Sequence, residues 1–230
     1  MTSVSPAPAP EREPQGGLFL AFEGVEGSGT STQSALLAER LRDAGMEVVL
    51  AREPGSTPLG ERVRSVVLND PGLTVPALSE MFLMLAARAA FVEDIVRPGL
   101  DAGKVVIADR FELSTLAYQG AGRGLPLDEI VRCNRTATGG LSPHVTFLLD
   151  LDPEEGARRQ MAAAKRPDRM EAEAREFHRR VAAGYRDLAS MVTGLTRIDA
   201  RGTVDDVRDQ VLRSLVDRFP RTFDVGGFIS

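Results

Sequence analysis

Apolar residues along this chain follow two patterns. A short apolar run at residues 18–24 is typical of a buried strand, and we predict further strands at residues 46–53, 104–111, 143–152 and 195–200. Between these segments apolar residues recur at helical spacing, which predicts helices at residues 31–45, 60–68, 75–100, 153–161, 173–192 and 204–219. The alternation predicts βαβ crossovers, so we expect an α/β fold with a five-stranded parallel sheet flanked by helices.

The ends of the chain differ from this central part. Residues 1–17 are rich in proline, alanine, serine and glycine, and they hold too few large apolar side chains to offset the entropy of ordering. We therefore predict a flexible tail at 1–17, a single domain over 18–219 and a C-terminal tail over 220–230. Within the domain, residues 75–100 have apolar side chains on most faces and should be largely buried.

Composition and charge narrow the class of protein. A formal net charge of −5 disfavours binding to a nucleic-acid polymer, although a few local arginines suffice for a mononucleotide. The chain has no apolar stretch of membrane-spanning length and no apolar signal core near its start, so we expect a cytoplasmic protein with no membrane partner. Cys133 is the only cysteine, which excludes an intramolecular disulfide and predicts a buried, inert thiol.

Polar residues follow four of the predicted strands where each strand ends. The pairs are Glu23-Gly24, Arg52-Glu53, Asp109-Arg110 and the stretch 150–152. Because the carboxyl ends of parallel strands meet at one edge of the sheet, and ligands bind at that edge, these residues predict the location of the functional site.

The first strand is followed by a stretch that almost matches a phosphate-binding loop. Gly24, Gly29 and Ser31 fit the pattern, but Thr30 stands where the pattern has lysine. Glycines allow the backbone N–H groups to turn toward a phosphate, the following helix N-terminus adds partial positive charge, and the Ser31 hydroxyl suits Mg²⁺. The alternative is a βα turn whose glycines serve only close packing.

The loss of the lysine affects catalysis more than binding. Lysine supplies a point charge at the transferring phosphate, whereas threonine supplies only a hydroxyl. Removing one positioned donor from a charged transition state costs about 3 kcal/mol, or roughly a hundred- to a thousand-fold in rate. Nucleotide binding could therefore persist while turnover falls.

Three further segments complete a recognisable set of motifs. They are REPGSTPLGERVR at 52–64, DRFELSTLAYQGAGRGL at 109–125 and the stretch from Arg166 to Ala189. Together with the glycine loop, their order and spacing resemble bacterial thymidylate kinase from about Leu18 to Phe219. The resemblance implies a P-loop nucleoside monophosphate kinase fold with a mobile lid at about 153–171. It also implies that ATP phosphorylates dTMP to dTDP with Mg²⁺, in a homodimer.

The resemblance assigns a donor side and an acceptor side to the site. On the donor side, the ATP-binding residues are Gly24, Val25, Glu26, Gly27, Ser28, Gly29, Thr30, Ser31 and Thr32, and Ser31 and Asp109 hold the metal. On the acceptor side, the dTMP-binding residues are Arg52, Met84, Arg88, Arg110, Thr115, Tyr118 and Gln119.

Each acceptor residue has an implied role. Arg110 forms bidentate hydrogen bonds to the acceptor phosphate. Arg52, oriented by Glu53, lines the other side of that phosphate pocket. Arg88 contacts a pyrimidine carbonyl from the same helix face as Met84, which replaces the aromatic residue usual in the family. The remaining acceptor contacts are to the base edge from Thr115 and Gln119 and to the sugar from Tyr118. Met84 and Tyr118 are alternatively ordinary core residues.

The catalytic residues implied are Asp109, Arg110, Glu26, Arg166 and Arg169. The last two belong to the predicted lid, where a cation would act on the phosphates as an arginine finger does. Alanines at 162–164 depart from the family, which often has arginine there, and a solvated basic face is the alternative for the lid cations. Three residues that differ from the family pattern, Thr30, Ser56 and Met84, would all belong to one pocket.

Three hypotheses follow for function. The first is an ATP- and Mg²⁺-dependent dTMP kinase. The second, favoured by Thr30, is a weak or inactive nucleotide-binding homologue that serves as a sensor or scaffold. The third is a kinase whose acceptor is a modified pyrimidine deoxynucleotide, because Met84 and Ser56 would reshape the acceptor pocket.

Overall fold

The computed structural model describes residues 16–70, 72–163, 168–192 and 194–223. Within them lies a five-stranded, all-parallel sheet, as predicted from the sequence. The structure adds the strand order, which is β2-β3-β1-β4-β5. The strands are β1 (Leu18–Gly24), β2 (Val48–Arg52), β3 (Val105–Asp109), β4 (Val145–Asp150) and β5 (Leu195–Asp199). The central strand β1 is buried along its whole length.

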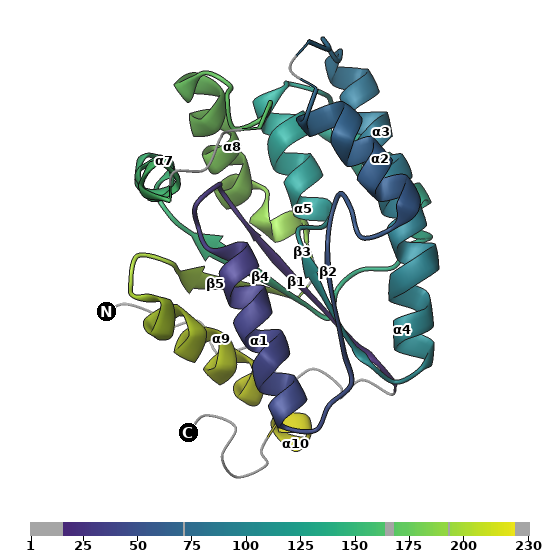
Figure 1. Ribbon diagram of the computed structural model, residues 1–230, viewed down its shortest axis with the longest axis vertical. Helices are drawn as coiled ribbons and strands as arrows, with labels where there is room; N and C mark the ends of the chain where they lie inside the picture. Colours follow the sequence, from purple (N-terminus) through teal and green to yellow (C-terminus); the bar gives the residue numbers. More distant parts are fainter. Residues whose placement is uncertain (1–15, 71, 164–167, 193, 224–230) are drawn as a thin grey trace, which may run out of the picture.

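The helices cover both faces of the sheet (Figure 1). They are α1 (Thr30–Asp43), α2 (Pro58–Leu68), α3 (Ala77–Phe91), α4 (Arg97–Asp101), α5 (Glu112–Thr115), α6 (Leu127–Thr138), α7 (Pro153–Ala162), α8 (Arg175–Asp187), α9 (Val204–Arg218) and α10 (Pro220–Phe223). Two π-helical segments, η1 (Val92–Val96) and η2 (Leu116–Gly122), and a short 3₁₀ turn, η3 (Ala189–Met191), complete the described elements. In Figure 1, α1 and α9 lie side by side across one face.

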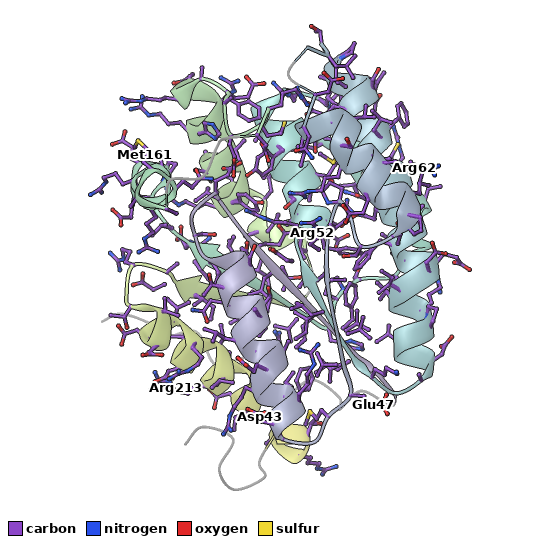
Figure 2. All side chains as sticks on the ribbon, in the orientation of Figure 1. Asp43, Glu47, Arg52, Arg62, Met161 and Arg213 are labelled. Atoms are coloured by element: carbon purple, nitrogen blue, oxygen red, sulfur yellow. The ribbon has the colours of Figure 1, made fainter. Side chains whose placement is uncertain are left out.

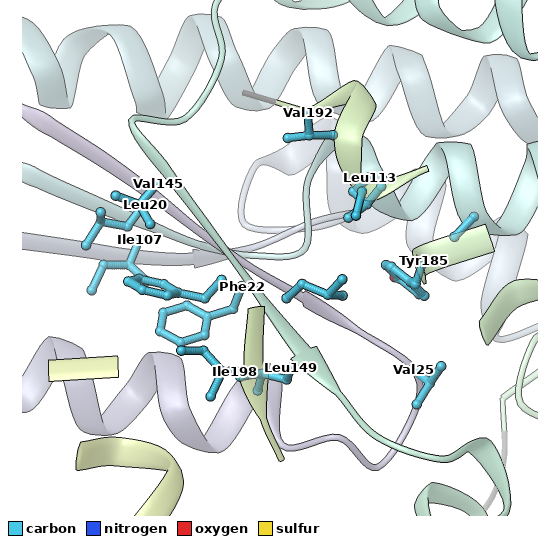
Figure 3. Close-up of a cluster of buried hydrophobic side chains, with 14 of the residues drawn as sticks. Leu20, Phe22, Val25, Ile107, Leu113, Val145, Leu149, Tyr185, Val192 and Ile198 are labelled. Carbon is cyan, nitrogen blue, oxygen red and sulfur yellow. The ribbon is translucent and has the colours of Figure 1, made fainter. Parts of the chain in front are cut away.

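Alternate residues of β1 supply two separate cores, because successive side chains of a strand point to opposite faces. Leu20 and Phe22 belong to the larger cluster, which includes residues of α1 and α9. Figure 3 shows these two side chains together with Ile107 from β3 and Ile198 from β5. Phe19, on the other face, packs edge-on against Phe111 in the smaller cluster. Burial on both faces fixes the sheet rigidly, and the sheet in turn positions its carboxyl edge.

Three local predictions differ from the structure. Helix α6 was not predicted, because it has few large apolar residues and Ile130 is the only one of them that is fully buried. The segment 75–100 is less buried than expected, since Phe82 on α3 is 54% exposed. Cys133 is half-buried rather than buried.

The folded chain also continues beyond the expected boundary at residue 219. Helix α10 follows α9 directly, and the Phe223 ring is buried 6.3 Å from the ring of Phe219. Residues 220–223 therefore belong to the domain, because they complete its apolar core. No helix among the described residues has the length and apolar character needed to cross a bilayer.

Candidate active site

A cavity of about 430 Å³ opens at the carboxyl edge of the sheet. It is lined by the β1–α1 loop, the ends of β2 and β3, one face of α3, segment η2 and the chain that follows α7. In Figure 2, Arg52, at the end of β2, is labelled near the centre of the view, with Arg62 and Met161 at opposite sides. The ends of β2 and β3 thus meet at this cavity, as the sequence pattern predicted. The stretch 150–152 does not, because it lines a separate pocket with Arg186 and Arg197.

The glycine loop is open to this cavity. Glu26, Gly27, Gly29, Thr30, Ser31 and Thr32 line it, whereas Gly24, Val25 and Ser28 do not. Gly29 caps α1 in the left-handed region, with φ of 97°, and forms no side-chain cap. The first backbone N–H groups of α1 are therefore available to an anion, which the helix dipole also attracts. The absence of lysine at position 30 leaves these backbone donors in place.

Arg110 lies against the backbone of the same loop. Its Nη1 donates hydrogen bonds to the Gly24 carbonyl and to the Tyr185 hydroxyl, the latter at 2.8 Å. Its Nη2 lies 3.5 Å from the Val25 carbonyl. Burial acts to lower the pKa of Arg110, but the neighbouring Tyr185, Tyr118 and acidic groups raise it, so the guanidinium remains charged. A cation from β3 therefore stands beside the loop that lacks its own.

Ser31 and Asp109 form an oxygen donor pair that suits Mg²⁺. The Ser31 hydroxyl donates to Asp109 Oδ2, while Asp109 Oδ1 is buried and has no hydrogen-bond partner in the described structure. An unpartnered buried carboxylate oxygen is costly unless a ligand satisfies it. Mg²⁺ prefers hard oxygen ligands and needs only one or two from protein when phosphates supply others. The residues present therefore fit the ion.

The acceptor side is built around Arg88, which is 3% exposed. Its Nε donates to both carboxylate oxygens of Glu53, at 2.8 and 3.0 Å, and its Nη1 donates to Thr115 Oγ1 at 2.8 Å. Burial raises the pKa of Glu53 to about 7, although the charge of Arg88 acts to lower it. Met84, Arg88, Thr115, Tyr118 and Gln119 all line the cavity.

The expected pairing of Glu53 with Arg52 is wrong. Glu53 turns inward to Arg88, and Arg52 instead donates to both carboxylate oxygens of Glu61, at 3.0 and 3.1 Å. The reason is strand alternation: Glu53 is buried and Arg52 is exposed. Ser56, with φ of 62°, adopts a conformation that glycine takes more easily, and its Oγ accepts from the Arg52 backbone N–H.

Comparison with known proteins accords with this geometry. A model of the thymidylate kinase family matches residues 22–211. The chain belongs to this family. The thymidylate kinase of Deinococcus radiodurans is 51% identical over 175 residues, covering 75% of this chain and 83% of that protein. The thymidylate kinase of Synechococcus sp. strain JA-2-3B'a(2-13) is 46% identical over 204 residues, covering 88% and 96%.

A solved structure extends the comparison to the fold. The crystal structure of thymidylate kinase from Ehrlichia chaffeensis has a TM-score of 0.71 to this chain at 34% sequence identity. The match covers 87% of this chain and 99% of the other. The predicted P-loop nucleoside monophosphate kinase fold is confirmed, as is the predicted resemblance to the thymidylate kinase family.

In this family member, the Glu26 carboxylate contacts Tyr118 of η2 and His178 of α8. The Tyr118 hydroxyl donates to Glu26 at 2.5 Å, and His178 Nδ1 lies 3.6 Å from its other oxygen. Burial acts to raise the pKa of Glu26, but His178, Arg110 and Tyr118 together lower it. Glu26 therefore stands as a carboxylate that joins the loop to η2 and α8.

The predicted lid begins with α7, which rests directly on the glycine loop. Gly156 of α7 meets Glu26 and Gly27 so closely that a Cβ on Gly27 would lie 2.2 Å from the Gly156 carbonyl oxygen. Arg169 donates to the Val67 carbonyl at 2.6 Å and to Glu80, so it would have to leave these partners to reach a phosphate. Arg166 lies outside the described residues.

Replacing Gly27 with alanine is expected to displace α7 from the loop. The new methyl group cannot fit against backbone atoms at 2.2 Å, so α7 must move. Gly29→Ala is the matched control, since it also places alanine at a positive φ but meets no atom of the described residues within 4 Å. Hydrogen exchange in residues 153–162 of the nucleotide-free protein should rise in Gly27→Ala alone. Equal protection in both variants would contradict the contact.

Several residues in or beside the cavity escaped the sequence prediction. Arg64 lines the cavity and donates to the Pro54 carbonyl at 3.1 Å. Glu80 and Asn134 are buried beside the acceptor residues, and Tyr185 lies beside Arg110. A signal for Glu80 was present, because it precedes Met84 by four residues and Arg88 by eight, which places all three on one helix face.

Proposed function

We propose that this protein transfers the γ-phosphoryl group of ATP to dTMP, with Mg²⁺, to form dTDP and ADP. Membership of the thymidylate kinase family supports the reaction class. The observation that carries the proposal is the single cavity that joins the uncapped N-terminus of α1 to the acceptor pocket around Arg88. A donor phosphate at the loop and a pyrimidine at Arg88 would share one cavity.

The residues of the site suit an in-line phosphoryl transfer. An oxygen of the dTMP phosphate forms a bond to the γ-phosphorus of ATP, while the bond from that phosphorus to the oxygen of the β-phosphate breaks. No covalent enzyme intermediate is required. Backbone N–H groups of the loop would bind the donor phosphates, and Arg52 and Arg110 would hold the acceptor phosphate. Mg²⁺, held through Ser31 and Asp109, supplies charge neutralisation between the donor phosphates.

The neutral Thr30 favours the second hypothesis, a nucleotide-binding homologue with weak or no activity. Against it stands Arg110, whose charged guanidinium lies on the carbonyl groups of Gly24 and Val25. We propose that Arg110 supplies the positive charge that a loop lysine would otherwise give, in addition to its contact with the acceptor. Positioned charge is the main catalytic contribution of a protein to phosphoryl transfer, so activity does not require the lysine itself.

A coupled ADP-release assay tests the proposed function. ADP should form when ATP, Mg²⁺ and dTMP are present together, and the same assay with dUMP, dCMP and modified pyrimidine nucleotides identifies the preferred acceptor. Calorimetric binding of ATP and dTMP is measured on the same preparation. Binding of both nucleotides with no dTMP-dependent ADP would overturn the proposal in favour of a sensor or scaffold.

We also propose that two copies of the chain associate through the outer faces of α2 and α3. Leu59 on α2 and Leu78 and Phe82 on α3 are each about half exposed, at 49%, 49% and 54%. Large exposed apolar side chains on packed helices favour burial against a second copy. Sedimentation velocity should give a species of twice the 24.8 kDa chain mass. A monomer at micromolar concentration would contradict the proposal.

A further inference from the structure

Glu80 is a fully buried carboxylate behind Gln119, which lines the acceptor pocket. It lies on α3, has no exposed surface, and is one helical turn from Met84. Its Oε1 accepts hydrogen bonds from Gln119 Nε2 at 2.9 Å and from Arg123 Nε at 3.1 Å. Its Oε2 accepts from Arg123 Nη2 at 3.1 Å and from Arg169 Nη2. Such burial is tolerated only with this number of charged partners.

The two arginines keep Glu80 ionised. Burial acts to raise the pKa of Glu80, but hydrogen bonds from Arg123, Arg169 and Gln119 bring it below its usual value. An ionised carboxylate accepts hydrogen bonds and cannot donate one. The group of Gln119 that faces Glu80 must therefore be its NH₂ group, which fixes the direction of the Gln119 amide.

The opposite end of that amide is available to a ligand. Gln119 lines the cavity, and no described residue donates a hydrogen bond to its Oε1. Gln119 Oε1 is therefore a hydrogen-bond acceptor of defined direction at the cavity. Thymine and uracil carry an N3–H donor between two carbonyl groups. Cytosine has an unprotonated N3 at the same place, and two acceptors facing each other repel.

We infer that Glu80 is a positioning residue that sets base specificity through Gln119. By holding the Gln119 amide in one direction, it makes the pocket favour pyrimidines with an N3–H over cytosine. Arg169 and Arg123 affect base specificity indirectly, because they keep the Glu80 carboxylate ionised. An ionised Glu80 can only accept a hydrogen bond from Gln119. This inference rests on the proposed function, since it takes the cavity around Gln119 to be the site of the acceptor base.

The test is the ratio of kcat/KM for dTMP to that for dCMP. Glu80→Gln keeps the size of the side chain but offers either a carbonyl or an NH₂ group to Gln119, so the amide direction is no longer fixed. We expect the ratio to fall by about tenfold, the effect of one hydrogen bond that is lost or opposed. Gln119→Leu should lower it similarly, and the double variant should lower it no further.

Glu173→Gln is the matched control. Glu173 also binds Arg123, at 2.6 Å, but it has no contact with Gln119, so its removal should leave the ratio unchanged. If Glu80→Gln lowers kcat/KM for dTMP and dCMP equally, its role is merely structural and the inference fails. If Glu80→Gln does not fold, as judged by circular dichroism, an unchanged ratio in Gln119→Leu overturns the inference instead.

Failure of the proposed function would be visible separately. It would appear as an absence of ADP formation by the unmodified protein with every pyrimidine nucleotide. In that case the inference is tested by binding alone, through the ratio of calorimetric affinities for dTMP and dCMP in the unmodified protein and in Glu80→Gln. An unchanged affinity ratio would overturn it.

Discussion

Replacing Arg110 with glutamine is expected to lower kcat for dTMP phosphorylation by about two to three orders of magnitude, the usual cost of removing one positioned donor at a charged transition state. In this chain we expect the loss of kcat to be close to three orders of magnitude, because Thr30 leaves the glycine loop without a charged side chain at that position. Glutamine keeps hydrogen-bonding capacity and bears the same positive φ, 79° at this position, so backbone strain is unchanged. Steady-state assays of ADP release measure the effect.

A lysine at position 30 should restore part of that activity. Thr30→Lys in the Arg110→Gln background is expected to raise kcat by about tenfold, because a cation again stands at the donor phosphates. Arg52→Gln is the control: Arg52 pairs with Glu61 and has no contact with the loop, so its cost should be the same whether position 30 holds threonine or lysine.

Two results would contradict the proposed role of Arg110. One is that Arg110→Gln raises the KM for dTMP but leaves kcat unchanged. The other is that Thr30→Lys fails to restore activity in the Arg110→Gln background. Together they would assign Arg110 to the acceptor phosphate alone.

Replacing Arg88 with methionine is expected to lower the free energy of unfolding by about 3–5 kcal/mol, the range for breaking a buried ion pair. The side chains of Arg88 and Glu53 are only 4% and 2% exposed, so Glu53 would be left without its cation in the core. Hydrogen bonds to Thr115, Asn134 and the Phe111 carbonyl would be lost as well. Urea unfolding followed by circular dichroism measures the change.

The chain supplies a matched control for this prediction in the neighbouring arginine. Arg52 and Glu61 also form an Arg–Glu pair, but their side chains are 53% and 48% exposed. Arg52→Met should therefore cost less than about 1 kcal/mol. Adding Glu53→Gln to Arg88→Met should recover part of the loss, since it removes the unpaired charge. Equal costs for Arg88→Met and Arg52→Met would show that burial of the pair has little energetic consequence.

Much of the fold could be predicted because its signals are local. Strands β1, β2 and β3 each contain a continuous apolar run, and β1 is recognisable from Leu18–Gly24 alone. The glycine loop and the polar strand ends likewise located the cavity, since parallel strands deliver their carboxyl ends to one edge. Helix α6 was missed because its few large apolar side chains give only a weak local signal. Its place is set by the elements it packs against.

The sequence by itself therefore determined the parallel sheet, the position of the phosphate-binding loop and the residue types that surround the cavity. Only the tertiary structure decided which charges pair: Glu53 with Arg88, Glu61 with Arg52, and Arg110 with the backbone of Gly24. Arg110 and Gly24 are separated by 86 positions in the chain. Such partners are chosen by burial, strand alternation and packing between distant elements, and no local pattern of residues encodes them.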